Sequence, residues 1–219
     1  MTEMDPQAQD IEKRAAAVAA AQAVESGMTV GLGTGTTVAF LLQALADRGL
    51  DVTCVSSSPR TEEAARALGL RTESFDAVAT LDIAIDGADE VSPDFWLIKG
   101  GGMAHTREKL VAAAADRFIV IVDSGKLRDR LTGPVPVELM AFGLASTLGR
   151  LPDVRVRGVD PSPDGGVIAD YFGPIDDPAD LAAMLSGTPG VVEHGLFPPS
   201  MVSEVVVGRG DEAEWLLPG

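Results

Sequence analysis

The sequence predicts an α/β protein, with a Rossmann-like open-sheet domain crossed by helices and a small ferredoxin-like α+β domain. Up to about residue 130, short apolar runs alternate with helix-like segments, as a parallel sheet with crossover helices requires. After Gly133 and Pro134 the order changes to βαββαβ, which is typical of a ferredoxin-like domain. We expect residues 1–132 and 202–219 to form the first domain and residues 133–201 the second.

In the first domain, Gly27 and Gly49 end the first two helices, because glycine readily adopts the left-handed conformation that follows a helix. The expected helices lie at 10–25, 37–47, 61–68 and 103–116. The expected strands lie at 28–32, 52–55, 81–85 and 118–122. A last strand, 202–207, is expected to return to this sheet, and the tail with Trp215 to pack or fray.

In the second domain, the segment 161–166 is rich in proline and glycine and is expected to be a hairpin turn. The expected strands lie at 136–139, 154–159, 167–171 and 191–196, and the expected helices at 141–148 and 178–185. Together these elements give the βαββαβ order of the ferredoxin-like domain.

Composition excludes several classes of partner. A net charge of −16 opposes binding to nucleic acid or to an anionic membrane, so neither is expected. The amino terminus lacks a signal-peptide core and the Ala-rich run 15–24 is too short to span a bilayer, so a cytoplasmic location is expected. Cys54 is the only cysteine, which rules out an intrachain disulfide, and its strand-like neighbours predict a buried apolar filler.

The loop Gly31–Thr37 lies between a predicted strand and a predicted helix, where free backbone N–H groups and the helix dipole favour an anion. Thr34, Thr36 and Thr37 add hydroxyl donors. The loop matches neither the Walker pattern nor G-x-G-x-x-G, and the next strand ends in Ser56–Ser58 where a dinucleotide site would have an acid. The pattern favours the phosphate of a small molecule; the alternative is a tight structural turn.

Two acids, Asp86 and Asp89, bracket Gly87 and Ala88 at the end of a predicted strand. Their spacing could direct both carboxylates into one cleft. The alternative is an ordinary turn, since Asp and Gly are common turn residues. The adjacent Glu90 is expected to be merely solvated.

Lys99 precedes Gly100, Gly101 and Gly102, and three successive glycines destabilise regular structure. Close approach of their amides to a ligand oxygen, beside the Lys99 charge, would explain them. The amides that begin the following helix would add to the same positive field. A flexible loop is the alternative.

Glu108 lies in that following helix, off the apolar stripe. The stripe is predicted to comprise Met103, Leu110, Val111 and Ala114. The pattern leaves two interpretations open, a functional carboxylate beside the glycine loop or a solvated one paired with Arg107 or Lys109.

Histidines and serines give no further catalytic pattern. His105 and His194 are isolated and lack metal-ligand spacing, so no metal is assigned. Ser56–Ser58 have no evident base partner, and are expected to cap the next helix or to contact a ligand.

Taken together, these motifs resemble ribose-5-phosphate isomerase, type A. The segments GLGTGTT, VSSS, DGADE, KGGG and TREK follow in the order of that family, and the pattern continues through FIVIVDSGKL, PVPVEL and PGVVEHGLF over nearly the whole chain. Thr36 stands where the family usually has serine, which keeps the hydroxyl and adds a methyl group.

The resemblance implies an intramolecular oxidoreductase that interconverts ribose 5-phosphate and ribulose 5-phosphate through a cis-enediol(ate), in the non-oxidative pentose phosphate pathway, without metal or cofactor. It implies that Glu108 is the general base and that Asp86 and Asp89 hold sugar hydroxyls and assist ring opening. It further implies that Lys99 and the amides of Gly100–Gly102 hold the reacting oxygens. The sequence does not say which of Asp86 and Asp89 protonates the ring oxygen.

The resemblance also implies a set of substrate-binding residues and a homodimer or homotetramer. The substrate-binding set comprises Lys13, Thr34, Gly35, Thr36, Thr37, Gly87, Ala88, Gly100, Gly101, Gly102 and Lys126.

Two other classes of function fit parts of the pattern. A non-enzymatic sugar-phosphate sensor would need an output module, and no basic DNA-binding segment is visible in this acidic chain. A deaminase or ester-forming enzyme on the same fold would need a catalytic His, or an acyl-accepting Glu in a different loop.

Overall fold

The computed structural model describes residues 5–218, which form two compact units. The first unit comprises the chain up to residue 88, residues 107–127 and the chain from residue 200 onward. The second comprises residues 89–106 and 128–199. The domain boundaries expected from the sequence, after 132 and after 201, stay a prediction.

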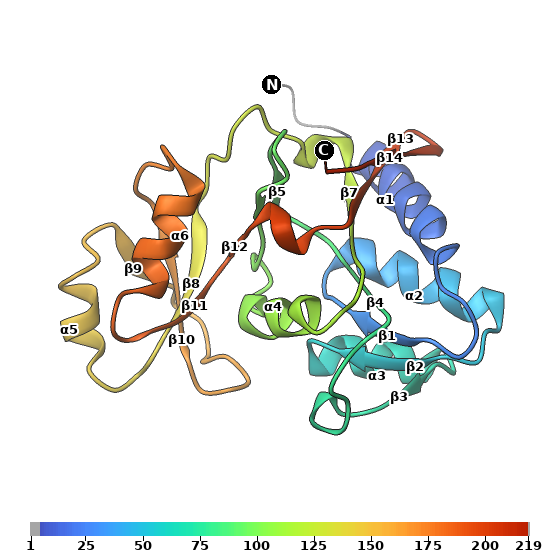
Figure 1. The fold of residues 1–219 in the computed structure, drawn as a ribbon, viewed down its shortest axis with the longest axis horizontal. Helices are drawn as coiled ribbons and strands as arrows, with labels where there is room; N and C mark the ends of the chain where they lie inside the picture. The colour runs from blue at the N-terminus through green and yellow to red at the C-terminus, as the bar shows by residue number, and fades with distance from the viewer. Residues whose placement is uncertain (1–4, 219) are drawn as a thin grey trace. The chain divides into compact units, whose positions relative to one another are not determined.

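The first unit contains a seven-stranded sheet in the order β14-β13-β7-β4-β1-β2-β3 (Figure 1). Its strands are β1 (Thr29–Leu32), β2 (Thr53–Ser56), β3 (Arg71–Thr72), β4 (Ile83–Asp86), β7 (Phe118–Asp123), β13 (Glu204–Arg209) and β14 (Glu212–Leu216). All neighbouring pairs are parallel except β13 and β14. The predicted Rossmann-like α/β class is therefore confirmed, and the tail with Trp215 is an edge strand.

Helices cover both faces of this sheet. The helices α1 (Pro6–Ala21), α2 (Thr36–Arg48) and α3 (Pro59–Ala67) bury apolar side chains in one core with Val30 and Leu32 of β1. On the opposite face, the Cγ1 of Val111 in α4 (His105–Ala113) would lie 2.6 Å from a Cβ at Gly31. Glycine at this position therefore lets α4 approach β1 closely.

The first helix begins and ends about one turn earlier than expected. Asp5 caps α1 by accepting the Gln7 N–H at 3.2 Å, and Pro6 takes the first helical position, where its missing N–H costs nothing. The expected start at residue 10 was wrong because an Asp-Pro pair is itself a helix start signal.

The second unit contains the predicted ferredoxin-like sheet, in the order β11-β8-β10-β9. Its strands β8 (Val135–Leu139), β9 (Val154–Val156), β10 (Val167–Tyr171) and β11 (Val191–His194) are all antiparallel to their neighbours. The helices α5 (Leu144–Leu148) and α6 (Pro178–Ser186) complete the βαββαβ order. The second strand and first helix of this set are shorter than the sequence pattern predicted.

A small three-stranded sheet, β12-β6-β5, was not predicted. It consists of β5 (Glu90–Val91), β6 (Leu97–Ile98) and β12 (Leu196–Phe197). The expected strand 191–196 was wrong as a single element, because the chain leaves β11 after His194 and pairs with β6 from Leu196. A Cβ at the intervening Gly195 would lie 2.1 Å from the Lys99 carbonyl oxygen, so glycine is needed at this crossing.

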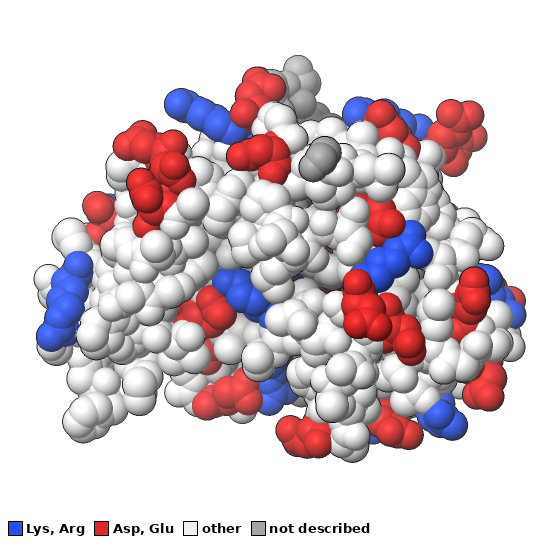
Figure 2. All heavy atoms as spheres, viewed as in Figure 1, with Lys and Arg blue, Asp and Glu red and all other residues white. Residues whose placement is uncertain are grey.

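Burial and surface charge agree with the composition. Cys54 is fully buried in β2, and burial raises the pKa of its thiol to about 11, which confirms the apolar filler. On the face drawn in Figure 2, acidic and basic side chains are interspersed, and the described residues there form no continuous basic area. Across residues 5–218, no helix combines the length and apolarity needed to cross a membrane.

Replacing Gly208 with Ala should destabilise the first unit. A Cβ at this position of β13 would lie 2.0 Å from the Glu12 carbonyl oxygen, and the backbone of α1 cannot rotate away as a side chain would. Overpacking of this kind costs about 1–3 kcal/mol of unfolding free energy, measured by denaturant titration. Gly158→Ala is the matched control, because its Cβ would meet nothing within 4 Å; equal stability of both variants would refute the prediction.

Candidate active site

Several predicted site residues of the first unit follow the carboxyl ends of neighbouring parallel strands, where open α/β sheets bind their ligands. The loop Gly33–Gly35 follows β1, Asp86 ends β4, and the short 3₁₀ helix η2 (Ser124–Lys126) follows β7. Because β7, β4 and β1 are neighbours in the sheet, these segments emerge side by side.

Asp86 is bound to the backbone of the loop after β1. Its Oδ1 accepts the N–H of Thr34 at 3.0 Å and that of Gly87 at 2.7 Å. A Cβ at Gly33 would lie 1.7 Å from the Asp86 Cγ, so only glycine fits there. Asp86 is 4% exposed, so these backbone donors help to satisfy a buried carboxylate.

Glu108 is joined to the same loop. The Thr34 hydroxyl donates to Glu108 Oε1 at 2.6 Å, and Glu108 is 4% exposed. The interpretation of a solvated helix carboxylate is therefore excluded. The predicted apolar stripe was wrong at Met103, which is exposed and precedes α4, and at Leu110, which is 57% exposed. The buried face of α4 instead carries His105 and Glu108 together with Val111 and Ala112.

The glycine-rich loop then leads into α2, as an anion site at a helix N-terminus requires. Gly35 is the N-cap of α2, with φ of +98°, and no side chain occupies the cap position. Gly35 and Thr36 are exposed and Thr37 is half-buried. Thr34 differs from these three residues, because its hydroxyl already donates a hydrogen bond to Glu108.

The two lysines predicted to bind substrate outside the glycine loop, Lys13 and Lys126, lie on segments that Glu12 connects. Lys13 is in α1 and Lys126 is in η2. Glu12 Oε2 accepts the N–H of Ser124 at 2.8 Å and its hydroxyl at 2.7 Å, and Glu12 Oε1 accepts the Gly210 N–H at 3.2 Å. This carboxylate therefore fastens α1 to the start of η2.

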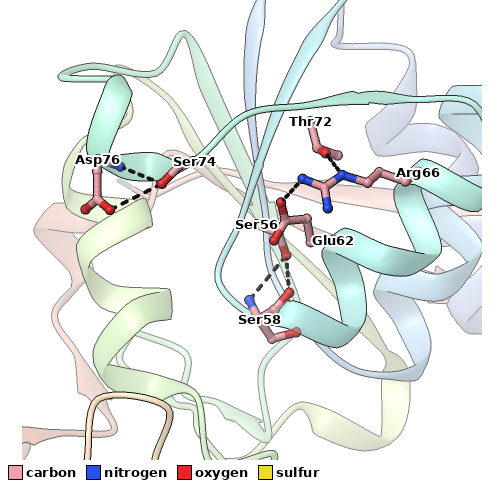
Figure 3. Close-up of polar contacts among 7 residues, drawn as sticks. All are labelled: Ser56, Ser58, Glu62, Arg66, Thr72, Ser74 and Asp76. Atoms are coloured by element: carbon pink, nitrogen blue, oxygen red, sulfur yellow. Dashed lines mark hydrogen bonds and ion pairs between the residues drawn. The ribbon is translucent and has the colours of Figure 1, made fainter.

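Ser56, at the end of β2, and the two serines that follow it form hydrogen bonds within the protein, and Figure 3 draws those of Ser56 and Ser58. Ser58 caps α3 by accepting the Thr61 N–H at 3.2 Å, which confirms the predicted cap. Ser56 Oγ donates to the Ser58 carbonyl at 2.9 Å, and the buried Ser57 donates to the Leu32 carbonyl at 3.2 Å. Further along the chain, Arg66 forms an ion pair with Glu62 and donates a hydrogen bond to the Thr72 hydroxyl, as Figure 3 shows.

In the second unit, Asp89 binds the triple-glycine loop. Its Oδ2 accepts the Gly101 N–H at 2.8 Å, and a Cβ at Gly101 would lie 2.9 Å from Asp89 Oδ1. Gly100 has φ of +97°, a conformation that L side chains rarely adopt, and a Cβ there would meet the His105 ring and Cβ. The loop is therefore a defined structure, and the flexible-loop alternative does not hold.

Lys99 precedes this loop and is 2% exposed. Its backbone N–H donates to the Gly195 carbonyl at 2.8 Å, and its Nζ lies 5.4 Å from the centroid of the Phe197 ring. An ammonium group in this position is shielded from water and held in part by the face of an aromatic ring.

Glu90 was expected to be solvated, and this prediction was wrong. Glu90 is 7% exposed. Its Oε1 lies 3.3 Å from Arg128 Nε, and its Oε2 accepts the Thr132 N–H at 2.7 Å. The carboxylate thus ties β5 to the segment before β8. Sequence reasoning missed this because the partners lie some forty residues away along the chain.

Two further polar residues, the buried Glu138 and the half-buried Arg157, were not singled out from the sequence. Glu138 of β8 accepts hydrogen bonds from the hydroxyls of Thr106 and Ser162. Arg157 forms a bidentate ion pair with Asp170 and also donates to the Gly101 carbonyl at 3.2 Å. For Arg157, the sequence offered one signal: Arg157 and Asp170 lie on two strands that were predicted to be neighbours.

The two histidines have different surroundings. His194 Nε2 lies 3.0 Å from Ser186 Oγ, whereas His105 is fully buried and lies against Gly100 of the triple-glycine loop. Within the described part of the chain, no group of three or more His, Cys, Asp or Glu residues is arranged to hold a metal ion.

Residues 53–212 match the protein family described as ribose 5-phosphate isomerase A (phosphoriboisomerase A). The chain belongs to this family. The ribose-5-phosphate isomerase A of Methanosarcina acetivorans is 42% identical to it over 97% of both sequences, and that of Gluconobacter oxydans is 45% identical over 94% of the chain and 96% of the relative. As a member of the ribose 5-phosphate isomerase A family, the chain is an isomerase.

Solved structures of this family have the same fold. Ribose 5-phosphate isomerase A from Neisseria gonorrhoeae superposes with a TM-score of 0.92 at 32% identity, covering 96% of the chain and 98% of that protein. A D-ribose-5-phosphate isomerase solved in complex with phospho-erythronic acid gives 0.90 at 34% identity, covering 98% and 100%. The order of elements in this chain is therefore that of its family.

Replacing Glu12 with Gln should destabilise the protein in a pH-dependent way. Burial alone would raise the pKa of Glu12, but hydrogen bonds from Ser124 and Gly210 and the charge of Arg209 together lower it. A lowered pKa contributes stability above the ordinary carboxyl pKa of about 4.3, and this contribution is lost as the pH falls through the lowered value. The variant should thus be less stable than the wild type near neutrality and approach it in acid.

The measurement is the unfolding midpoint in denaturant at about pH 7 and about pH 3. Glu25→Gln, at an exposed position, is the control and should follow the wild type at both values. A Glu12→Gln deficit that is the same at both pH values would contradict the account.

Proposed function

We propose that the chain interconverts ribose 5-phosphate and ribulose 5-phosphate through a cis-enediol(ate), as a step of the non-oxidative pentose phosphate pathway. The observation that carries the proposal is the hydrogen bond between Thr34 and Glu108, which links a buried carboxylate to the predicted phosphate loop. A proton acceptor is thereby fixed beside the loop that would anchor the substrate. The names of the relatives support the same substrate.

Glu108 is the proposed general base. It would take the proton from C2 of the open-chain aldose while the electron pair moves through the C1–C2 bond to the carbonyl oxygen. The proton of the C2 hydroxyl would pass to the C1 oxygen, and the same carboxylic acid would return its proton to C1 as the ketone forms at C2, so that no net proton is consumed. The Thr34 hydroxyl holds one Glu108 oxygen in place, which reduces the reorganisation needed at the moment of transfer.

The proton transfer places negative charge on the substrate oxygens, and Lys99 with the amides of Gly100–Gly102 is proposed to stabilise it. Preorganised donors at a developing oxyanion contribute roughly 3–4 kcal/mol each. The burial of Lys99 supports this assignment, since an ammonium group removed from water interacts more strongly with a nearby anion.

The acids and the remaining donors are proposed to bind the rest of the substrate. Asp86 and Asp89 would hold sugar hydroxyls and assist ring opening, with Gly87 and Ala88 between them. The phosphate would be bound by the amides and hydroxyls of Thr34–Thr37, with Lys13 and Lys126. The backbone hydrogen bonds of Asp86 and Asp89 and the contacts of Glu12 support segments that are each ordered, within their own unit, before substrate binds.

Phospho-erythronic acid is proposed to bind this chain as it does its solved relative. The acid carries a phosphate and a carboxylate, and the two carboxylate oxygens reproduce the paired, negatively charged oxygens of an enediolate. We also propose a cytoplasmic homodimer or homotetramer, as the family resemblance implies.

The Glu108→Gln variant should lose at least about 10²-fold in turnover, because general base catalysis typically contributes 10²–10⁴-fold. The amide keeps an acceptor for the Thr34 hydroxyl, so KM for ribose 5-phosphate should change little. The assay incubates purified protein with ribose 5-phosphate and measures formation of the ketose. Glu63→Gln, at an exposed position of α3, is the control and should turn over like the wild type.

Nearly normal turnover of the Glu108→Gln variant would remove Glu108 as the base. Binding of ribose 5-phosphate by the wild type without any conversion would instead overturn the proposed reaction and favour a sugar-phosphate sensor.

A further inference from the structure

The Gly101 residue is held from both sides. Its N–H donates to Asp89 Oδ2 at 2.8 Å, and its carbonyl oxygen accepts from Arg157 Nη1 at 3.2 Å. The two peptide groups that flank the Gly101 Cα are therefore each fixed by a charged side chain. Gly101 has no side chain to help define its conformation, so these two bonds determine how the loop presents its amides.

The bond to Arg157 has a direct consequence for Gly102. The carbonyl of Gly101 and the N–H of Gly102 belong to one planar trans peptide and point in opposite directions. When Arg157 fixes the carbonyl, it also fixes the direction in which the Gly102 N–H points. The Gly101 N–H is already committed to Asp89, so of these two amides it is the Gly102 N–H that can be directed at a ligand oxygen.

Arg157 is itself rigidly placed. Its Nε and Nη2 each lie 2.6 Å from one oxygen of Asp170, in the parallel fork geometry that arginine and carboxylate favour. The side-chain hydrogen bond to Asp170 raises the pKa of Arg157, and the nearby charges of Asp170 and Asp89 act in the same direction. The fork uses Nε and Nη2, which leaves Nη1 directed at the Gly101 carbonyl.

The ion pair of Arg157 and Asp170 is attached to the ferredoxin-like sheet. Asp170 lies in β10, and the Arg157 N–H continues the ladder beyond β9 by donating to the Ile168 carbonyl at 2.9 Å. Arg157 thus connects the glycine loop to a sheet. Residues attached to a sheet are placed more precisely than residues that only a loop supports.

We propose that Arg157, oriented by Asp170, is a positioning residue for the isomerisation: it sets the direction of the Gly102 N–H toward the reacting oxygens. This proposal rests on the proposed function, because it assumes that the glycine amides stabilise the enediolate. Arg157 acts through the loop and does not itself contact the substrate.

The test replaces Arg157 with Lys, which keeps the charge but cannot form the fork and reach the carbonyl together. We expect kcat for ribose 5-phosphate to fall about 10-fold or more while KM changes less than about 3-fold, since a transition-state interaction is weakened. The Kd of phospho-erythronic acid should rise in proportion to the loss in kcat. The Kd of inorganic phosphate, which lacks the carboxylate, should not change.

Two further variants sharpen the result. Asp170→Asn leaves Arg157 in place but weakens the fork, and it should shift kcat and the Kd of phospho-erythronic acid in the same direction. Arg155→Lys is the matched control on β9, where Arg155 is exposed and stacks on Phe172 with 5.1 Å from guanidinium carbon to ring centroid; it should behave like the wild type. The unfolding midpoint of every variant is measured alongside.

Wild-type kcat and wild-type affinity for phospho-erythronic acid in Arg157→Lys and Asp170→Asn would overturn the proposal. A parallel loss of affinity for phospho-erythronic acid and for inorganic phosphate would also overturn it, because it would indicate general disruption. If the wild type fails to convert ribose 5-phosphate, the proposed function fails; a selective loss of phospho-erythronic acid binding in Arg157→Lys would still support the role of Arg157 in orienting the loop.

Discussion

The loop after β1 passes so close to Asp86 that no side chain can occupy position 33. This contact depends on β1 and β4 being parallel neighbours, since only then do their carboxyl ends meet at one edge of the sheet. Asp86 in turn fixes the Thr34 N–H, and the Thr34 hydroxyl fixes Glu108. The acid, the loop and the carboxylate of α4 are therefore one connected structure, and a change at Gly33 would disturb all three.

Burying carboxylates is costly unless hydrogen bonds replace the lost water. The protein meets this cost in the same way in both units, by binding each acid of the DGAD turn to a glycine-rich loop. Asp86 binds the loop of the first unit through Thr34, and Asp89 binds the loop of the second unit through Gly101. A short turn with an acid at each end thus organises two loops that are far apart in sequence.

The sequence predicted the order of helices and strands well, because alternation of apolar runs and helical segments is a local property. It failed for β5 and β6, which are only two residues long and carry no detectable periodicity. It also failed for Glu90 and for the buried face of α4, since the burial of a polar residue depends on distant partners such as Thr132 and Thr34. The family motifs predicted Glu108 as a site residue, but not the hydroxyl that holds it.

The glycines of the two motifs have different physical reasons, which the sequence alone could not separate. Gly35 and Gly100 adopt positive φ, a backbone conformation that L side chains rarely adopt, so any other residue there would be strained. Gly33 and Gly101 are required because an acid lies where a Cβ would be. The second reason ties these glycines to Asp86 and Asp89. A substitution of either acid by a larger or uncharged residue should therefore alter loop conformation as well as chemistry, and kinetic effects of such variants report on both.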